Sequence, residues 1–127
     1  MKKESNFHPS SLHNSGYDFE KLIKANIALK QFVIKNDYDN LSIDFSDPKA
    51  VKELNRSLLF ADYNIKLWEF PDENLCPPIP GRVDYIHHLN DLIKDEKDIT
   101  VLDIGTGATC IYPLLGNAVY GWNFVGT

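Results

Sequence analysis

The sequence is poor in the residues that mark metal-stapled, disulfide-rich and membrane proteins. Its only two cysteines, Cys76 and Cys110, lie too far apart in sequence for a metal-binding or redox motif. This usage is typical of a reducing compartment, so we expect a cytoplasmic protein. No apolar run approaches the length of a membrane span, and no apolar segment follows the polar start. We therefore expect no membrane partner, no secretory signal and no bound metal.

Positive charge is also scarce. Thirteen Lys and Arg residues face 18 Asp and Glu residues, which gives a net charge of −5. A chain with this balance does not attract nucleic acid through its overall field, so any such binding requires a local basic patch. An apolar content of 43% and a charged content of 24% are ordinary for a folded domain and exclude a disordered chain.

The most informative stretch is TVLDIGTGATC, residues 100–110. Its apolar positions predict a buried strand: Val101, Leu102 and Ile104. Gly105 and Gly107 allow a tight turn that exposes backbone N–H groups to a ligand, and Asp103 ends the strand with a hydrogen-bond acceptor. Because Cys110 replaces the third glycine of the dinucleotide-binding pattern, the stretch by itself fits a nucleotide site and a plain strand-turn-helix equally well.

The residues on either side of this stretch predict an α/β chain. We expect a helix over residues 81–93 before it and a short helix after Cys110, followed by a second parallel strand over residues 121–127. Arg82 and Tyr85 open the first of these helices, where they can face the ligand, and an arginine there suits a carboxylate. A surface salt bridge of Arg82 is the alternative. Of the adjacent pair His87 and His88, one is expected to be buried and one exposed.

The first half of the chain predicts mainly helices. Residues 18–35 read as two short helices with Asp18 as the N-cap, and residues 36–40 as a turn. Asp47-Pro48 starts a helix that runs to about Asp62. Strands are expected over residues 41–45 and 63–70, before a proline-rich loop over residues 71–80. Residues 1–16 look like a mobile or extended arm, in which His8 and His13 are expected to be solvated rather than metal ligands.

Several blocks resemble a known family in the same order along the chain. The long ones are CPPIPGRVDYIHHL at residues 76–89 and DIGTGATCIYPLLG at residues 103–116, and the short ones lie at residues 8–9, 17–19 and 44–59. Together they resemble the bacterial large-subunit (23S) rRNA adenine-N6 methyltransferase F family. They are also similar to the related eukaryotic U6-snRNA/mRNA adenine-N6 methyltransferase.

The resemblance implies a cofactor, a fold and a division of the chain. The cofactor is S-adenosyl-L-methionine, held by the glycine turn of a class I Rossmann-like sheet. By motif, the residues around its methionine and ribose would be Asp103, Gly105, Thr106, Gly107 and Ala108, and Arg82 would reach its carboxylate. Residues 1–70 would form a mainly helical module that contacts rRNA, and residues 71–127 would begin the cofactor domain with its first β-α-β unit.

The sequence departs from that family in two respects. Between His-Pro and Tyr-Asp, where family members usually carry arginines, this chain has Ser10, Ser11, Leu12 and His13. Lys21, Lys24, Lys30, Lys35 and Arg56 are candidates to compensate. The Asn-Pro-Pro-Phe/Tyr motif that receives the adenine amine in the family is absent, so no catalytic residue is assigned.

The sequence and this resemblance therefore predict an S-adenosylmethionine-dependent rRNA adenine-N6 methyltransferase, present as an incomplete chain. Such a piece is expected to have open sheet edges and low stability. One alternative is a truncated remnant that binds RNA or a partner without chemistry. A dinucleotide-dependent oxidoreductase is disfavoured because Cys110 replaces the third glycine and the proline-rich block would have no role.

Overall fold

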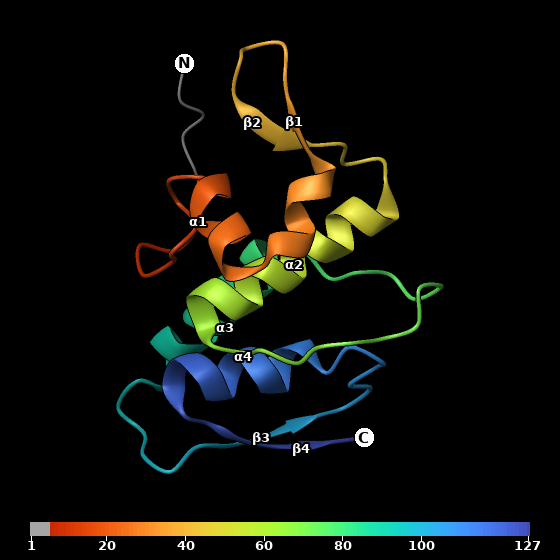
Figure 1. Cartoon of the computed structure of the whole chain (residues 1–127). Coiled ribbons are helices and arrows are strands. Elements are labelled where there is room, and N and C mark those ends of the chain that lie inside the picture. The colour runs from red at the N-terminus through yellow and green to blue at the C-terminus, as the bar shows by residue number, and fades with distance from the viewer. Residues whose placement is uncertain (1–5) are drawn as a thin grey trace. The chain divides into compact units, whose positions relative to one another are not determined.

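The computed structural model describes residues 6–127 and divides the chain into two compact units (Figure 1). Residues 17–68 form one unit. The other combines residues 69–127 with the N-terminal segment up to Gly16. Of the arm predicted over residues 1–16, residues 1–5 lie outside the described part.

The unit of residues 17–68 begins with two short helices of different kinds. Helix α1 (Phe19–Ala25) starts where the sequence predicts, and the side chain of Asp18 accepts a hydrogen bond from the N–H of Lys21 at 3.1 Å. The second element, η1 (Ile27–Phe32), is a 3-10 helix rather than an α-helix. Asn26 separates the two in an extended conformation and caps η1 by accepting from the N–H of Ala28, which explains the break in the helical pattern.

A hairpin and a long helix complete this unit. Strands β1 (Val33–Lys35) and β2 (Leu41–Ile43) pair antiparallel around the predicted turn. Helix α2 (Pro48–Tyr63) begins at the predicted Asp47-Pro48 pair, where the Asp47 carboxylate accepts from the N–H of Lys49 at 3.0 Å. One stripe of α2 is buried in the core: Ala50, Leu54, Leu58 and Leu59.

The strand predicted over residues 63–70 is wrong. After α2 ends at Tyr63, residues 64–78 form neither helix nor strand. Trp68 and Phe70 are buried, whereas Leu67 is 90% exposed, so the alternation of apolar residues reflects two anchoring side chains rather than a strand. An extended segment becomes a strand only when another backbone pairs with it. The proline-rich loop predicted over residues 71–80 ends at residue 78, because Ile79 and Pro80 already belong to the next helix. Proline is tolerated in the first turn of a helix, where its missing N–H would have no partner within the helix.

The second unit contains the predicted β-α-β arrangement. Helix α3 (Ile79–Ile93) is followed by β3 (Thr100–Asp103), α4 (Ile111–Tyr120) and β4 (Asn123–Gly126). The two strands pair parallel, with Val101 opposite Phe124 and Leu102 opposite Val125. Helix α4 lies between α3 and the sheet (Figure 1). The helix after Cys110 is longer than predicted, because Gly116 does not end it and Gly121 does.

Burial of the first strand differs from the prediction. Val101 is half-buried on the face that α4 covers, but Leu102 is 60% and Ile104 is 79% exposed. Leu102 shares its face with Val125, which is 56% exposed. The prediction of burial from apolar content is therefore wrong for Leu102 and Ile104, because only one face of β3 is covered among residues 6–127.

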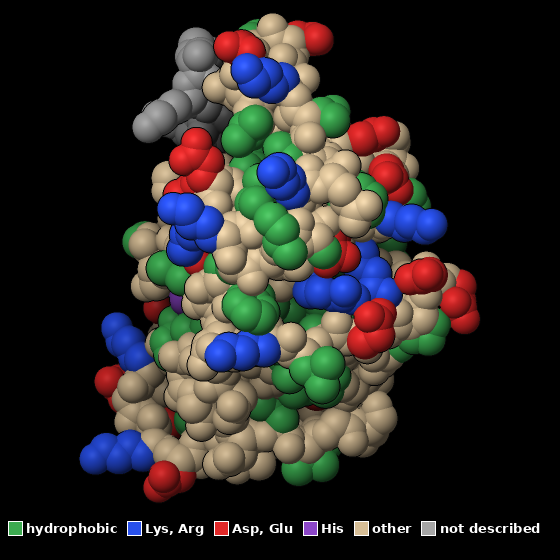
Figure 2. Space-filling model, viewed as in Figure 1, with side chains coloured by type: hydrophobic (Ala, Val, Ile, Leu, Met, Phe, Trp, Pro, Cys, Tyr) green, Lys and Arg blue, Asp and Glu red, His purple; other side chains and the backbone are tan. Residues whose placement is uncertain are grey.

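No helix within residues 6–127 combines the length and the apolar character needed to cross a bilayer. On the face that Figure 2 shows, Lys and Arg side chains are interspersed with Asp and Glu side chains. The view therefore matches a chain whose overall charge is mixed and slightly acidic.

Candidate functional site

The glycine turn lies at the carboxyl end of β3. Gly105 and Gly107 have φ angles of +73° and +77°, in the left-handed region that side chains rarely adopt. A Cβ atom added at either glycine would meet no atom within 4 Å. Glycine is thus required here by the backbone conformation and not by crowding, and the space beside both residues is open to a ligand.

Thr127, the residue after β4, helps to hold the turn in this shape. The N–H of Thr106 donates to the carbonyl oxygen of Thr127 at 3.1 Å, and the N–H of Gly105 donates to the Thr127 hydroxyl at 3.1 Å. The Thr106 hydroxyl donates to the carbonyl oxygen of Asp103 at 2.9 Å. The prediction that the turn presents its N–H groups to a ligand is wrong for Gly105 and Thr106, since Thr127 already binds both. Gly107 and Ala108 are exposed.

Asp103 carries an unsatisfied acceptor. Its side chain is half-buried, and its Oδ2 atom is shielded from solvent without a hydrogen-bond partner. A buried carboxylate oxygen without a donor costs free energy, so such atoms are uncommon in folded proteins and call for an explanation. This oxygen lies at the end of a parallel strand next to the glycine turn, where ligands of α/β sheets bind. A hydroxyl or amino group of a ligand would satisfy it.

Arg82 is fixed against the helix that follows the turn. Its Nη1 atom donates to the hydroxyl of Tyr112 at 3.2 Å, and its guanidinium carbon lies 5.9 Å from the centre of the Tyr112 ring. Tyr85 contacts the same ring edge-on, with 5.4 Å between centroids. Arg82 forms no salt bridge among residues 6–127, so the surface salt bridge that was the alternative prediction for this residue is absent from the described part of the chain.

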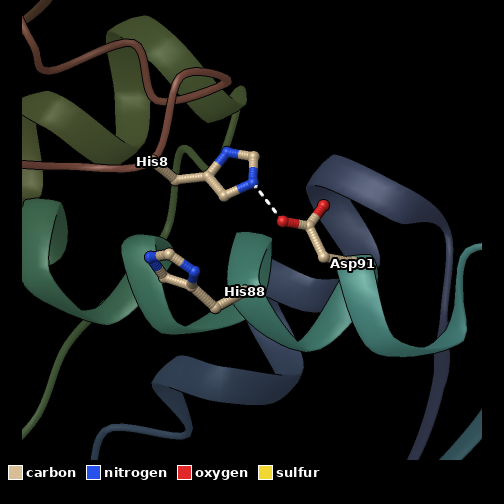
Figure 3. A group of neighbouring side chains, drawn as sticks. All are labelled: His8, His88 and Asp91. Carbon is tan, nitrogen blue, oxygen red and sulfur yellow. Dashed lines mark hydrogen bonds and ion pairs between the residues drawn. The ribbon is translucent and has the colours of Figure 1, made fainter.

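A cluster of histidines and acids that sequence reasoning missed joins residues 6–16 to α3 (Figure 3). The His8 backbone N–H donates to Asp84 Oδ1 at 2.7 Å, and the His8 ring lies 2.6 Å from Asp91 Oδ2. His8 and His13 are buried rather than solvated, with 11% of the His8 side chain and 5% of His13 exposed. For His8 the prediction is wrong because its partners lie 76 and 83 residues away and leave no local signal.

The prediction for the adjacent histidines is confirmed. His87 is buried, and its Nδ1 atom lies 2.7 Å from the hydroxyl of Tyr120 on α4. Burial lowers the pKa of His87, and the nearby His8 lowers it further. The His88 side chain is 59% exposed. His87 therefore packs in the core while His88 faces solvent.

Three members of the cluster offer ligand atoms within 4.8 Å of one another: His8, His88 and Asp91. The hydrogen bonds of His8 oppose metal binding in this arrangement. Its Nδ1 atom accepts from the N–H of Ser10 at 3.0 Å, so Nε2 carries the proton that is donated to Asp91. A metal on Nε2 would require the opposite tautomer and would set two donors against each other at Ser10. The hydrogen bonds of His8 to Asp84 and Asp91 instead hold the N-terminal segment against α3.

Acidic neighbours engage most of the basic residues predicted to compensate for the missing arginines. Lys21 pairs with Asp62 at 2.6 Å, an interaction that raises the pKa of the lysine. Lys35 pairs with Asp39 at 3.4 Å, and Arg56 with Glu53 at 3.6 Å. Lys24 and Lys30 are exposed. The unit of residues 17–68 therefore offers less uncompensated positive charge than its lysines suggest.

Comparison with known proteins gives consistent matches. A family model described as RNA methyltransferase matches residues 1–127. The ribosomal RNA large subunit methyltransferase F of Flavobacterium psychrophilum is 51% identical over all of this chain and 43% of its own length. The protein of the same name from Colwellia psychrerythraea is 54% identical over 94% of this chain and 43% of its own length. The chain thus spans less than half the length of these relatives.

Solved structures agree with the fold. The N-terminal domain of human METTL16 in complex with SAH matches with a TM-score of 0.85 and 37% identity, over 94% of this chain and 48% of that chain. The METTL16 catalytic domain in complex with MAT2A 3'UTR hairpin 6 matches with a TM-score of 0.86 and 37% identity, over 96% of this chain and 44% of that chain.

These matches confirm the predicted fold class, which is α/β with part of a class I Rossmann-like methyltransferase sheet. They also agree with the family that the blocks at residues 76–89 and 103–116 resemble. The chain belongs to the RNA methyltransferase family.

Proposed function

We propose that this chain forms the first part of the S-adenosyl-L-methionine site of a methyltransferase that acts on the N6 amine of an adenine in large-subunit rRNA. The family match, the names of the relatives and the SAH complex of the METTL16 domain support this proposal. The observation that carries it is the buried, unpartnered Oδ2 of Asp103 beside an open glycine turn.

We assign each site residue a role that its geometry supports. Asp103 accepts a hydrogen bond from a hydroxyl or amino group of the cofactor. Gly105, Gly107 and Ala108 let the cofactor approach the backbone closely, because the glycine positions leave open space. Thr106 shapes the turn, since its hydroxyl is bound to the carbonyl oxygen of Asp103.

Arg82 completes the set by binding the cofactor's carboxylate. A guanidinium presents parallel N–H groups that match a carboxylate in a bidentate pair. The bound cofactor supplies an activated methyl group for direct transfer to the amine of an extruded adenine. The residues of this chain contribute to that reaction by binding and orienting the cofactor, and they include no group assigned to the adenine.

The remaining assignments are proposals of the same standing. We place the protein in the cytoplasm, where ribosomes are assembled, and assign rRNA contact to the N-terminal residues 1–70. Within that span, residues 17–68 form a unit of their own and residues 6–16 pack with the cofactor unit. Exposed cations that could contact phosphates in this span of the described residues include Lys24, Lys30, Lys49 and Lys66.

Isothermal titration with S-adenosylhomocysteine tests the cofactor site. The protein should bind this ligand and not NAD, and Asp103→Ala should weaken binding at least tenfold because it removes the acceptor. Asp84→Asn is a matched control, since Asp84 is a half-buried acid on α3 that contacts His8 instead. It should leave the affinity unchanged. Equal affinity for NAD, or an unaffected Asp103→Ala variant, would contradict the proposal.

Methylation of ribosomal RNA that lacks the modification tests the reaction. The natural protein that contains this chain should transfer a methyl group to adenine N6 in that RNA, and its Asp103→Ala variant should lose most activity at limiting cofactor. RNA or partner binding without methyl transfer by the natural protein would favour the alternative of a non-catalytic remnant.

A further inference from the structure

Tyr112 lies outside the residues assigned to the cofactor, yet it makes the one side-chain hydrogen bond that Arg82 forms among residues 6–127. It occupies the second position of α4, two residues after the glycine-turn stretch ends at Cys110. Arg82 lies in the first turns of α3. Tyr112 thus joins the helix that carries the arginine to the helix that follows the turn.

We propose that Tyr112 is a positioning residue that holds the guanidinium of Arg82 ready for the carboxylate of an amino-acid-bearing nucleoside. This inference rests on the proposed function and adds to it how the carboxylate is selected. Tyr112 acts through Arg82 and does not itself contact the ligand.

The chemistry of the pair supports this role. An acidic partner would hold Arg82 equally well but would neutralise its charge. The phenol hydroxyl accepts one N–H at 3.2 Å and leaves the positive charge uncompensated. A guanidinium has five N–H donors, so four remain for a carboxylate after the bond to Tyr112.

The ring of Tyr112 adds a second restraint. The guanidinium carbon lies 5.9 Å from the ring centre, within the range of a cation–π contact. Tyr85 also packs edge-on against the Tyr112 ring, with 5.4 Å between the ring centroids. An arginine side chain loses rotamer entropy when it is fixed. Fixing it before the ligand arrives removes part of that cost from binding.

The test compares two ligands in one variant. S-adenosylhomocysteine carries the carboxylate, whereas 5′-methylthioadenosine has the same nucleoside and thioether without it. Tyr112→Phe keeps the ring and removes the hydroxyl. Its affinity for S-adenosylhomocysteine should fall roughly three- to tenfold, which corresponds to one hydrogen bond, while its affinity for 5′-methylthioadenosine should change less than about twofold. If Tyr112 had a purely structural role, Tyr112→Phe would lower the affinity for both ligands alike.

Tyr120→Phe is the matched control. Tyr120 ends the same helix, is half-buried and also bonds through its hydroxyl, but to His87 at 2.7 Å. This variant should melt at a lower temperature and bind both ligands with unchanged affinity. The comparison separates loss of stability from loss of ligand affinity.

Variants of Arg82 link the effect to the proposed partner. Arg82→Ala should lower the affinity for S-adenosylhomocysteine more than Tyr112→Phe does. Adding Tyr112→Phe to Arg82→Ala should lower that affinity no further. Arg82→Lys keeps the charge but cannot donate to the phenol and a carboxylate as a planar fork, so it should also lose discrimination between the ligands.

The outcomes distinguish the two proposals. If Arg82→Ala weakens binding and Tyr112→Phe does not, or if Tyr112→Phe weakens both ligands equally, the positioning role is overturned and the cofactor site stands. If the unsubstituted protein binds neither ligand, the proposed function fails and the positioning role fails with it.

Discussion

Because α4 approaches β4 closely, a glycine-to-alanine substitution should change stability in opposite directions in two helices. Gly116 lies in the interior of α4, and a Cβ atom added there would meet the ring of Phe124 and would lie 3.1 Å from Trp122 Cε3. Gly81 lies in α3, and a Cβ atom added there would meet nothing within 4 Å. Glycine to alanine should therefore have opposite effects in these two helices.

The magnitudes follow from two competing contributions. Alanine gains about 0.5–1 kcal/mol over glycine in a helix, and Gly81→Ala should be stabilised by up to that amount. At Gly116 the same gain is opposed by overpacking, which costs about 1–3 kcal/mol. Trp122 is only 5% exposed and cannot move aside easily. We expect Gly116→Ala to be destabilised by about 1–2 kcal/mol net.

Urea unfolding followed by circular dichroism measures both variants against the unsubstituted protein. The Phe124→Ala background removes the obstructing ring, so Gly116→Ala should cost less there than in the unsubstituted chain. A Gly116→Ala protein that is as stable as the parent, with the same dependence on urea, would show that helix and strand do not approach as closely as the reasoning requires.

Three further predictions concern caps and histidines. Asp47→Ala should lower the free energy of unfolding by about 1 kcal/mol, because the N–H of Lys49 loses its acceptor, and Asp47→Asn should largely restore it; urea titration measures both. Because burial lowers the pKa of His87, the unfolded chain binds its proton more readily, so stability should be full above the unfolded pKa of about 6.5 and fall as the pH drops below it. His87→Asn should flatten melting temperature against pH over that window, and an unchanged slope would rule His87 out as the cause. His8→Ala should expose residues 6–16 to protease by removing the bond to Asp91, whereas His88→Ala, on the exposed side, should not.

Local signals in the sequence predicted the elements whose causes are local. Asp47-Pro48 starts α2 because the carboxylate caps the helix and proline has the right φ angle, and both features are visible within three residues. The parallel pair β3 and β4 followed from two apolar segments separated by a glycine turn and a helix. The tight turn predicted at Gly105 and Gly107 is present, with both residues at positive φ.

Predictions failed where distant partners decide the structure. His8 reads as solvated in a polar segment, but Asp84 and Asp91, 76 and 83 residues away, bind it against α3. The segment with Leu67 and Trp68 alternates like a strand, yet no backbone pairs with it among residues 6–127. The contact between Arg82 and Tyr112 also spans 30 residues. Arg82 could be singled out from its motif, but its orientation could not.

The bonds between Thr127 and the glycine turn have a consequence for synthesis. The N–H of Gly105 reaches a hydroxyl 22 residues further along the chain, and the N–H of Thr106 reaches the carbonyl of the same residue. While the ribosome is still translating β4, the turn therefore lacks the partners that define its shape. These two hydrogen bonds can form only after Thr127 has left the exit tunnel, so the turn reaches its final shape late in the synthesis of this unit.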